Sequence, residues 1–281
     1  MILVTAATAP VGRSIVEQLV AAGRPVRALT RDAEGAGLPE AAQIAIGDLS
    51  DPDSLRAALE GVMSVFLLAV VPGFAPAFLA AAKEAGVRRI VFQSSGAVDD
   101  AAAEQPNAIA AFHAELEQEI KASGIAWTFL RLELASANAI QWALDVPGQL
   151  KAGDTVRAPY AKAAGSPIHP ADFAAVAAAA LTSSEHEGAV YRMTGSQSLT
   201  HAEQIAAIGT AVGRELRFEE ITPAQAAEAM GPYAPAEVLL ADWAEHLHRP
   251  APSSGVVEAV TGRPARTFAQ WAADHATDFT A

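Results

Sequence analysis

The stretch that decides the fold is "ILVTAATAPVG", residues 2–12. An apolar strand, a tight turn and a helix start follow one another here, which is the frame of a dinucleotide-binding loop. Glycines normally allow the turn and the close approach of the pyrophosphate, but Ala6 and Ala9 stand at two such positions and only Gly12 remains. An alanine keeps its N–H, and its methyl group is tolerated if φ stays negative, whereas Pro10 has no N–H. The loop predicts either a weakened phosphate site or a plain strand-to-helix turn in a protein that has lost its nucleotide.

Downstream of this loop, short apolar runs alternate with stretches of helical spacing. We expect strands at Ile2–Val4, Pro25–Leu29, Gln43–Ile46, Val65–Ala69, Arg89–Phe92 and Trp127–Leu130, and helices at Arg13–Ala22, Asp53–Leu59, Ala77–Ala85 and Ile109–Ala122. The alternation predicts an α/β fold of the Rossmann type, with a doubly wound parallel sheet. We expect the core over residues 1–135. Residues 136–281 then form a smaller, mostly helical substrate-binding cap, and part of 165–195, with the strand-like segment 189–194, returns to the core sheet.

Composition narrows the possible partners. The net charge is −13 and no run of lysine or arginine occurs, which argues against binding to nucleic acid or to an anionic membrane. The apolar residues 62–82 are interrupted by Pro72, Gly73 and Pro76, so they predict a buried strand and helix rather than a membrane span. Cysteine is absent, which excludes disulfides and fits a cytoplasmic protein. Histidine spacing offers no good chelate, and we predict no metal.

Seven stretches along the chain follow the order of one known family. They are TAATAPVG (5–12), VRALTRD (26–32), GDLSDPDSL (47–55), GVRRIVFQSS (86–95), ASGIAWTFLR (122–131), PIHPADFAAVAAAAL (167–181) and VTGRPARTFAQWAADHATDF (260–279). Together they resemble the NmrA-like atypical short-chain dehydrogenase/reductases over nearly the whole chain. The resemblance implies a Rossmann core, a C-terminal cap and a nicotinamide dinucleotide between them. The family also contains redox-sensing regulators, so an NADP(H)-sensing regulator without turnover stays an alternative to an enzyme.

The end of the second predicted strand indicates which dinucleotide binds. Sites that prefer NAD place an acid there, about 20 residues after the loop, to bind the ribose 2′-hydroxyl. This chain has Thr30 and Arg31 instead. A guanidinium can pair with a 2′-phosphate, and the Thr30 hydroxyl could add a hydrogen bond, so we predict NADP(H). The alternative is that Arg31 is a solvated residue beside Asp32.

The resemblance also implies the cofactor-binding residues: Thr5, Ala7, Thr8, Ala9, Pro10, Val11, Arg31, Asp48, Leu49, Ala69, Val70, Ser94 and His113. In this arrangement Asp48 and Leu49 flank the adenine, Ala69 and Val70 lie against the adenosine ribose, and Ser94 and Ser95 end the fifth strand near the nicotinamide. A purely structural role is the alternative for each of them, because Asp48 and Leu49 could simply precede a helix and the serines could cap a strand end.

The expected catalytic pair is missing from the sequence. Typical short-chain reductases use a tyrosine with a lysine four residues later, but the residues four before Lys83, Lys121, Lys151 and Lys162 are Leu79, Glu117, Pro147 and Ala158. Many NmrA-like proteins carry a lysine in the helix after the fifth strand, where this chain resembles them but has His113. That histidine could bind the ribose or the nicotinamide amide, donate a proton near neutral pH, or be a solvated helix residue.

These observations predict an NADPH-dependent reductase that acts on a carbonyl or quinone of a flat aromatic substrate. Ser95 and His113 are the candidate catalytic residues, and Ser95, Phe74 and Trp142 the candidate substrate-binding residues. The alanine-substituted loop, the missing pair and His113 are similar to angucyclinone-type polyketide ketoreductases of antibiotic biosynthesis. In such an enzyme a hydroxyl group of the substrate could supply the proton.

Overall fold

The computed structural model describes residues 1–69, 71–136, 145–230 and 236–280. Its chain divides into two compact units. The first unit comprises Met1–Leu132, Pro170–Met193 and Ala259–Gly262, and the second comprises Glu133–His169, Thr194–Glu258 and Arg263–Ala281. The first unit is therefore discontinuous in sequence, because the chain returns to it after residue 169.

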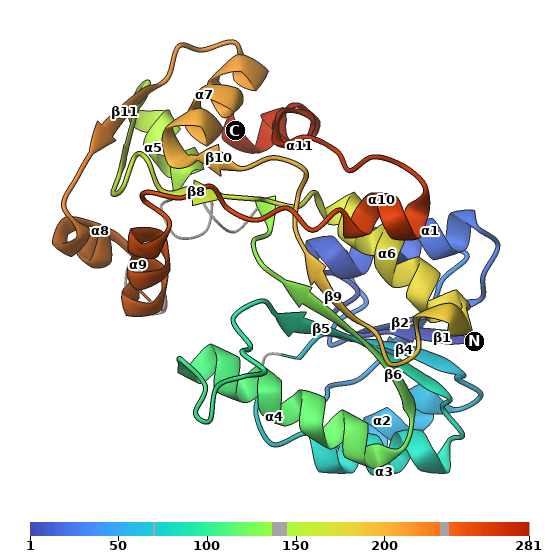
Figure 1. Ribbon diagram of the computed structural model, residues 1–281. Helices are drawn as coiled ribbons and strands as arrows, with labels where there is room; N and C mark the ends of the chain where they lie inside the picture. The colour runs from blue at the N-terminus through green and yellow to red at the C-terminus, as the bar shows by residue number, and fades with distance from the viewer. Residues whose placement is uncertain (70, 137–144, 231–235, 281) are drawn as a thin grey trace. The chain divides into compact units, whose positions relative to one another are not determined.

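A seven-stranded parallel sheet forms the centre of the first unit (Figure 1). Its strands are β1 (Ile2–Val4), β2 (Val26–Thr30), β3 (Gln43–Ile46), β4 (Ser64–Leu67), β5 (Arg89–Ser95), β6 (Ala126–Leu132) and β9 (Val190–Met193). The strand order is β3-β2-β1-β4-β5-β6-β9. The order reverses at β1 and β4, and in open α/β sheets ligands bind beyond the carboxyl ends of the strands at such a point. The predicted doubly wound α/β fold is confirmed.

Helices cover both faces of this sheet (Figure 1). They are α1 (Pro10–Ala21), α2 (Pro52–Leu59), α3 (Ala75–Glu84), α4 (Ala108–Ser123) and α6 (Pro170–Thr182). Side chains on β4 show the two-sided burial. Val65 and Leu67 join the core under α2, α3 and α4, whereas the Phe66 ring meets Phe173 of α6 edge-on at 6.5 Å. Alternating residues of a strand point to opposite faces, so a fully buried strand must be apolar throughout.

Most predicted elements lie within two or three residues of their observed bounds, but β5 and β6 are longer than expected. The expected strands ended at Phe92 and Leu130, whereas the observed strands continue to Ser95 and Leu132. The extensions contain polar residues, which pair in register, with Ser94 opposite Arg131. Hydropathy ends a predicted strand where polar residues begin, but here the Ser94 and Arg131 side chains both bond to Glu117 and the ladder continues.

The second unit contains short strands that the sequence reading missed. β7 (Thr155–Ala158) pairs in parallel with β11 (Arg217–Glu220), and β8 (Ala164–Gly165) pairs antiparallel with β10 (Leu199–Thr200). The sequence reading expected a mostly helical cap and did not predict these four strands. Strands of two to four residues carry no periodic signal, and their pairing joins segments far apart in the sequence.

Helices supply the rest of the second unit. They are α5 (Val146–Ala152), α7 (His201–Val212), α8 (Pro223–Met230), α9 (Ala236–Glu245) and α11 (Phe268–Asp274), and α10 (Val256–Thr261) runs across the boundary between the units. A core of Trp243, Phe268, Trp271 and neighbouring aliphatic residues holds them together. Among the described residues, each helix is too short or too polar to cross a membrane.

Candidate cofactor site

The loop between β1 and α1 explains how alanines replace glycines. Ala9 has φ −72° and ψ 155°, an extended conformation that any residue adopts. Ala6 has φ +48°, in the left-handed region that favours glycine. The condition that φ stays negative thus holds at Ala9 and fails at Ala6. At Gly12 a Cβ atom would lie 2.2 Å from the carbonyl oxygen of Ala6, so this glycine is required by close packing.

The first turn of α1 is prepared for an anion. Pro10 occupies its first position, the preceding Ala9 makes no side-chain capping bond, and the described first turn has no acidic residue. Backbone N–H groups at a helix start have no partner within the helix, and the helix dipole places partial positive charge there. The described geometry therefore fits a bound phosphate, as in other dinucleotide-binding loops.

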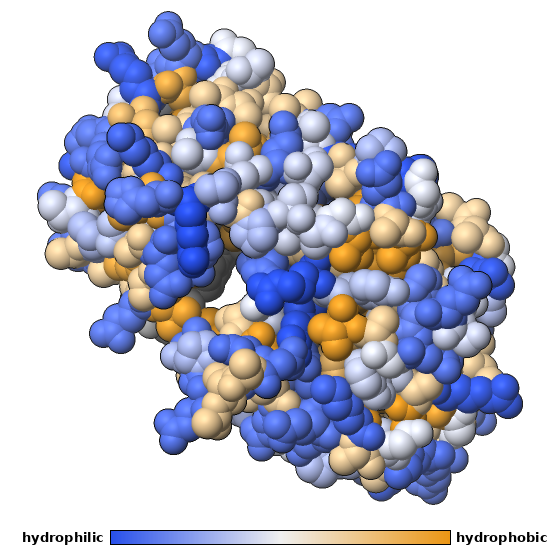
Figure 2. Space-filling view, viewed as in Figure 1, coloured by the Kyte–Doolittle hydropathy of each residue, from blue (hydrophilic) through white to orange (hydrophobic). Residues whose placement is uncertain are grey.

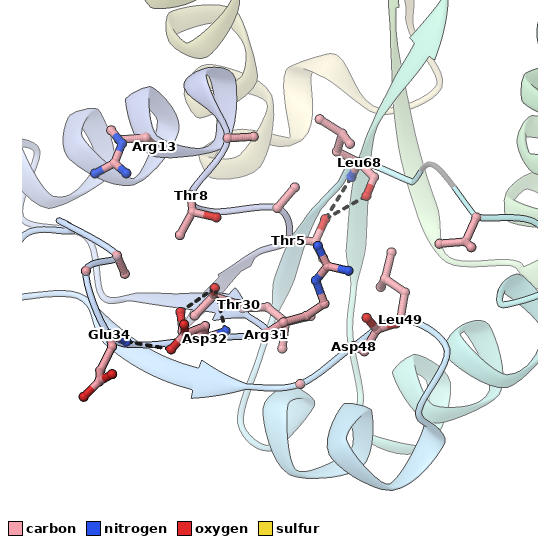
Figure 3. A pocket seen from close by; sticks show the side chains of 17 residues that line it. Thr5, Thr8, Arg13, Thr30, Arg31, Asp32, Glu34, Asp48, Leu49 and Leu68 are labelled. Carbon is pink, nitrogen blue, oxygen red and sulfur yellow. Dashed lines mark hydrogen bonds between the residues drawn. The ribbon is translucent and has the colours of Figure 1, made fainter. Parts of the chain in front are cut away.

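A hollow of about 500 Å³ opens beside this turn, entirely within the first unit (Figure 3). Segments that follow the carboxyl ends of β1, β2, β3 and β4 surround it, as expected for a doubly wound sheet. The lining residues are Thr5, Ala6, Thr8, Ala9, Arg13, Leu29, Thr30, Arg31, Asp32, Glu34, Gly35, Ala36, Gly47, Asp48, Leu49, Leu68 and Val71.

Charges of both signs line this hollow. Figure 3 shows Arg31 extending on the side of Asp48. Hydrogen bonds from the Ser50 hydroxyl and backbone N–H, and then the charge of Arg31, lower the pKa of the Asp48 carboxyl. A second guanidinium, that of Arg13, donates to the carbonyl oxygen of Gly37 in the middle of the loop between β2 and β3. Two cations, Arg13 and Arg31, therefore line the hollow.

Two threonines in the hollow use their hydroxyls within the protein. The Thr30 hydroxyl donates to the carbonyl oxygen of Asp32 at 2.8 Å, so it is committed to the turn after β2. A hydrogen bond from Thr30 to a 2′-phosphate would have to replace this one, and it stays a prediction. The Thr5 hydroxyl oxygen accepts from the Leu68 N–H at 2.9 Å and joins the ends of β1 and β4 (Figure 3).

The structure brings together about half of the predicted cofactor residues. Those that line the hollow are Thr5, Thr8, Ala9, Arg31, Asp48 and Leu49; those that do not are Ala7, Pro10, Val11, Ala69, Ser94 and His113. Val70 and Trp142 lie outside the described residues. Sequence reasoning missed Asp32, Glu34, Gly35 and Ala36 in the loop after β2. Ligands bind beyond the carboxyl ends of parallel strands, and this rule could have identified the loop because it follows β2.

Ser94, predicted to lie near the nicotinamide, belongs to a buried polar network. Its hydroxyl donates to Glu117 Oε1 on α4 at 2.7 Å, and Arg131 on β6 contacts both oxygens of the same carboxylate at 2.9 and 2.7 Å. Arg131 also forms two bonds of 2.7 Å with Asp100. The neighbouring Ser95 points to the other face of the strand, and its hydroxyl oxygen accepts from the Ala97 N–H at 3.2 Å. The contact of either serine with a nicotinamide stays a prediction.

His113 lies on α4 among aromatic rings. Its ring centroid is 5.6 Å from that of Phe92 and 5.2 Å from that of Phe112. Burial lowers the pKa of its imidazole to about 4, although the Glu117 charge opposes the shift. At pH 7 almost all of the imidazole is therefore in its neutral form and very little is the protonated form that acts as an acid. This argues against the proton-donor role. Its Nδ1 atom is buried without a partner among the described residues, and the binding of a ribose or a nicotinamide amide by this ring stays a prediction.

Phe74, a predicted substrate contact, is part of the core. The residue is 3% exposed, and its ring packs against that of Phe78 of α3 with centroids 6.0 Å apart. The ring therefore has almost no surface left for a substrate, and we assign it to packing. Among the described residues, no group of three or more potential ligands is arranged to hold a metal ion.

This fold and hollow define a dinucleotide-binding protein of the doubly wound α/β class. A family described as NAD(P)H-binding matches residues 6–184. The chain is 42% identical to the (4-alkanoyl-5-oxo-2,5-dihydrofuran-3-yl)methyl phosphate reductase of Streptomyces griseus and 39% identical to the NAD(P)H azoreductase of Xenophilus azovorans, over 99% of each chain in both cases. The structure of an NADPH-dependent quinone oxidoreductase from Escherichia coli matches 98% of this chain and 99% of its own, with a TM-score of 0.76 and 25% identity.

The chain therefore belongs to the NAD(P)H-binding family and is an NAD(P)H-dependent oxidoreductase. The resemblance to NmrA-like atypical short-chain reductases is confirmed.

Proposed function

We propose that the protein is an NADPH-dependent reductase of a carbonyl or quinone on a flat, conjugated substrate. When bound, the reduced nicotinamide supplies a hydride. The N-terminus of α1 holds the pyrophosphate, and Arg31 binds the 2′-phosphate. The position of Arg31 at the end of β2, lining the hollow beside Asp48, supports this preference for NADPH.

The kind of substrate follows from how few side chains the protein offers as proton donors for the reaction. The sequence has no tyrosine followed by a lysine four residues later, and His113 is neutral at pH 7 because its pKa is about 4. A simple ketone needs an acid as negative charge develops on its oxygen. A conjugated acceptor spreads that charge, and a hydroxyl beside the carbonyl can pass its own proton. The burial of the His113 ring against Phe92 and Phe112, which keeps the imidazole neutral, is thus the observation that carries the choice of an acceptor that stabilises its own charge.

Relatives agree with this chemistry. One is named for an alkanoyl-substituted furanone, one for azo compounds and one for quinones. In each name the reducible group is an unsaturated system into which a hydride can add. By analogy we extend the proposal to a hydroxylated aromatic polyketide as natural substrate, as in the angucyclinone-type ketoreductases of antibiotic biosynthesis.

The test measures loss of reduced nicotinamide absorbance with menadione, a hydroxyanthraquinone, its methyl ether and a simple aliphatic ketone. We expect turnover of menadione and the hydroxyanthraquinone, slower turnover of the methyl ether and none of the aliphatic ketone. Turnover of the methyl ether at the full rate, abolished by Ser95→Ala, would show that the proton comes from the protein. If NADPH binds but none of these acceptors is reduced, the proposed substrate class is wrong.

A further inference from the structure

The loop between β5 and α4, residues 96–107, is a small structure with its own internal bonds. The Asp99 N–H donates to Gln105 Oε1 at 3.0 Å, and Gln105 Nε2 donates back to the Asp99 carbonyl oxygen at 2.9 Å. The Ala101 N–H donates to Asp99 Oδ1 at 2.9 Å. At the end of the loop, Asn107 caps α4 through the Ala110 N–H. These bonds shape the loop but do not fix where it lies relative to the sheet.

Asp100 connects the middle of this loop to the sheet. Its two carboxylate oxygens accept from Nη1 and Nη2 of Arg131, each at 2.7 Å. The Asp100 side chain is 73% exposed, whereas that of Arg131 is 4% exposed. The first part of the loop is held separately, because the Gly96 N–H donates to the Leu132 carbonyl oxygen at 2.8 Å and Val98 is buried.

Charge balance does not explain Asp100. Glu117 is buried and already pairs with Arg131 through two hydrogen bonds, so the arginine has a counter-charge without the loop. The bidentate geometry with Asp100 adds directional bonds to a guanidinium that the core holds rigidly. Arg131 lowers the pKa of Asp100, first through its hydrogen bonds, so the pair persists below neutral pH. The second carboxylate, that of Asp100, therefore serves to hold loop 96–107 in position.

The loop follows directly from Ser95, at the edge of the sheet where ligands of doubly wound proteins bind. We propose that Asp100 is a positioning residue, which through Arg131 holds loop 96–107 in place and thereby sets the fit of the conjugated substrate. This inference rests on the proposed function. The loop that the salt bridge holds lies outside the nucleotide hollow, because no residue of 96–107 lines that hollow. The inference therefore concerns the fit of the substrate and not that of the nucleotide.

The experiment compares Asp100→Asn, which removes the charge and one acceptor, with Asp100→Glu, which restores a carboxylate. The control is Glu219→Gln, since Glu219 is also an exposed acid paired with an arginine, Arg157, at 3.0 Å. For Asp100→Asn we expect amide hydrogen exchange over residues 96–107 to quicken and KM for menadione to rise about tenfold. The dissociation constant of NADPH should stay within about twofold. Asp100→Glu should recover part of the loss, and Glu219→Gln should change nothing.

Two outcomes would overturn the proposal. Unchanged exchange over the loop would show that Asp100 does not hold it, and unchanged KM despite faster exchange would show that the loop does not set substrate fit. If Asp100→Asn weakens NADPH binding as much as it raises KM, and also lowers the thermal stability of the protein, Asp100 has a merely structural role. That result would also overturn the proposal. If the wild-type protein reduces no acceptor, the proposed function and the substrate half of this inference fail together, whereas hydrogen exchange still decides whether Asp100 holds the loop.

Discussion

At the residue scale, the substituted loop distinguishes three roles that glycines share in this motif. Ala6 takes the left-handed φ, Ala9 the extended conformation, and Gly12 the close approach to the Ala6 carbonyl. Only the last role excludes a side chain outright. The sequence showed which glycines were missing, but φ at each position depends on how the chain leaves β1, and this was visible only in the structure.

Replacing Ala6 by glycine should stabilise the protein. An alanine at φ +48° costs about 1–2 kcal/mol, while the extra freedom of glycine in the unfolded chain offsets about half of that gain. We expect Ala6→Gly to raise the free energy of unfolding by about 0.5–1 kcal/mol in urea titrations. The control is Ala41→Gly, because Ala41 is exposed and its φ is not positive. That change should lower the free energy of unfolding, and a loss of stability in both variants would contradict strain at Ala6.

Gly12→Ala should have the opposite effect. The new Cβ would meet backbone atoms that cannot yield, so we expect a loss of more than about 2 kcal/mol in the free energy of unfolding and no detectable binding of NADPH. Gly23→Ala is the matched control, because Gly23 has φ +67° but open space around its Cβ position. It should cost about 1 kcal/mol and leave binding intact. Equal effects of the two changes would show that close packing at Gly12 is unimportant.

At the scale of elements, sequence reasoning predicted only some of the polar residues on α4 and at the ends of β5 and β6. Ser94, Ser95 and His113 were predicted as site residues because they occupy positions that the family uses. Glu117 and Arg131 were not, because 14 residues separate them and only the register of β5 with β6 brings Arg131 beside Ser94. The pKa of His113 was equally hidden, since it depends on burial by Phe92 and Phe112 and not on the helix sequence.

The environment of α4 makes stability depend on pH through His113. The folded pKa is about 4, and the unfolded value is near 6.5. Below pH 6.5 the unfolded chain therefore binds more protons, and stability falls as the pH drops toward 4. We expect His113 to contribute on the order of 3 kcal/mol to this fall in unfolding titrations. His113→Phe, which keeps an aromatic ring beside Phe92, should flatten the curve in this range, and an unchanged curve would contradict the buried neutral imidazole.

At the scale of the whole molecule, the boundary expected at residue 135 lies close to Leu132, where the chain first leaves the first unit, and Pro170–Met193 returns to that unit. The strand β9 pairs with β6, and α6 packs against α1 and β4; Gln18 Nε2 on α1 donates to the Ala171 carbonyl oxygen at 2.8 Å. Sequence reasoning expected part of 165–195 to return to the core, because "AVYRMT" looks like a strand. Small residues dominate α6. They identify it as a buried helix, but they do not show which face of the sheet it covers.

This arrangement predicts how fragments behave. A fragment of residues 1–135 lacks α6 and β9, so it should expose the apolar face of α1 and unfold without a cooperative transition. A fragment of residues 1–193 keeps all seven strands and α6, and we expect it to regain a cooperative thermal transition by circular dichroism. Cooperative unfolding of the shorter fragment would show that the core is complete without the returning segments.

The central claim is that a loop with two alanines still holds NADPH and that Arg31 selects it. Calorimetric titration of NADPH and NADH into the wild-type protein and Arg31→Ala tests it most directly. We expect micromolar binding of NADPH by the wild type, and a loss of roughly ten- to a hundredfold in Arg31→Ala, because a charge-assisted guanidinium–phosphate contact contributes about 1.5–3 kcal/mol. NADH binding should change little. No heat from the wild type with millimolar NADPH, or an equal loss for both dinucleotides in Arg31→Ala, would contradict the claim.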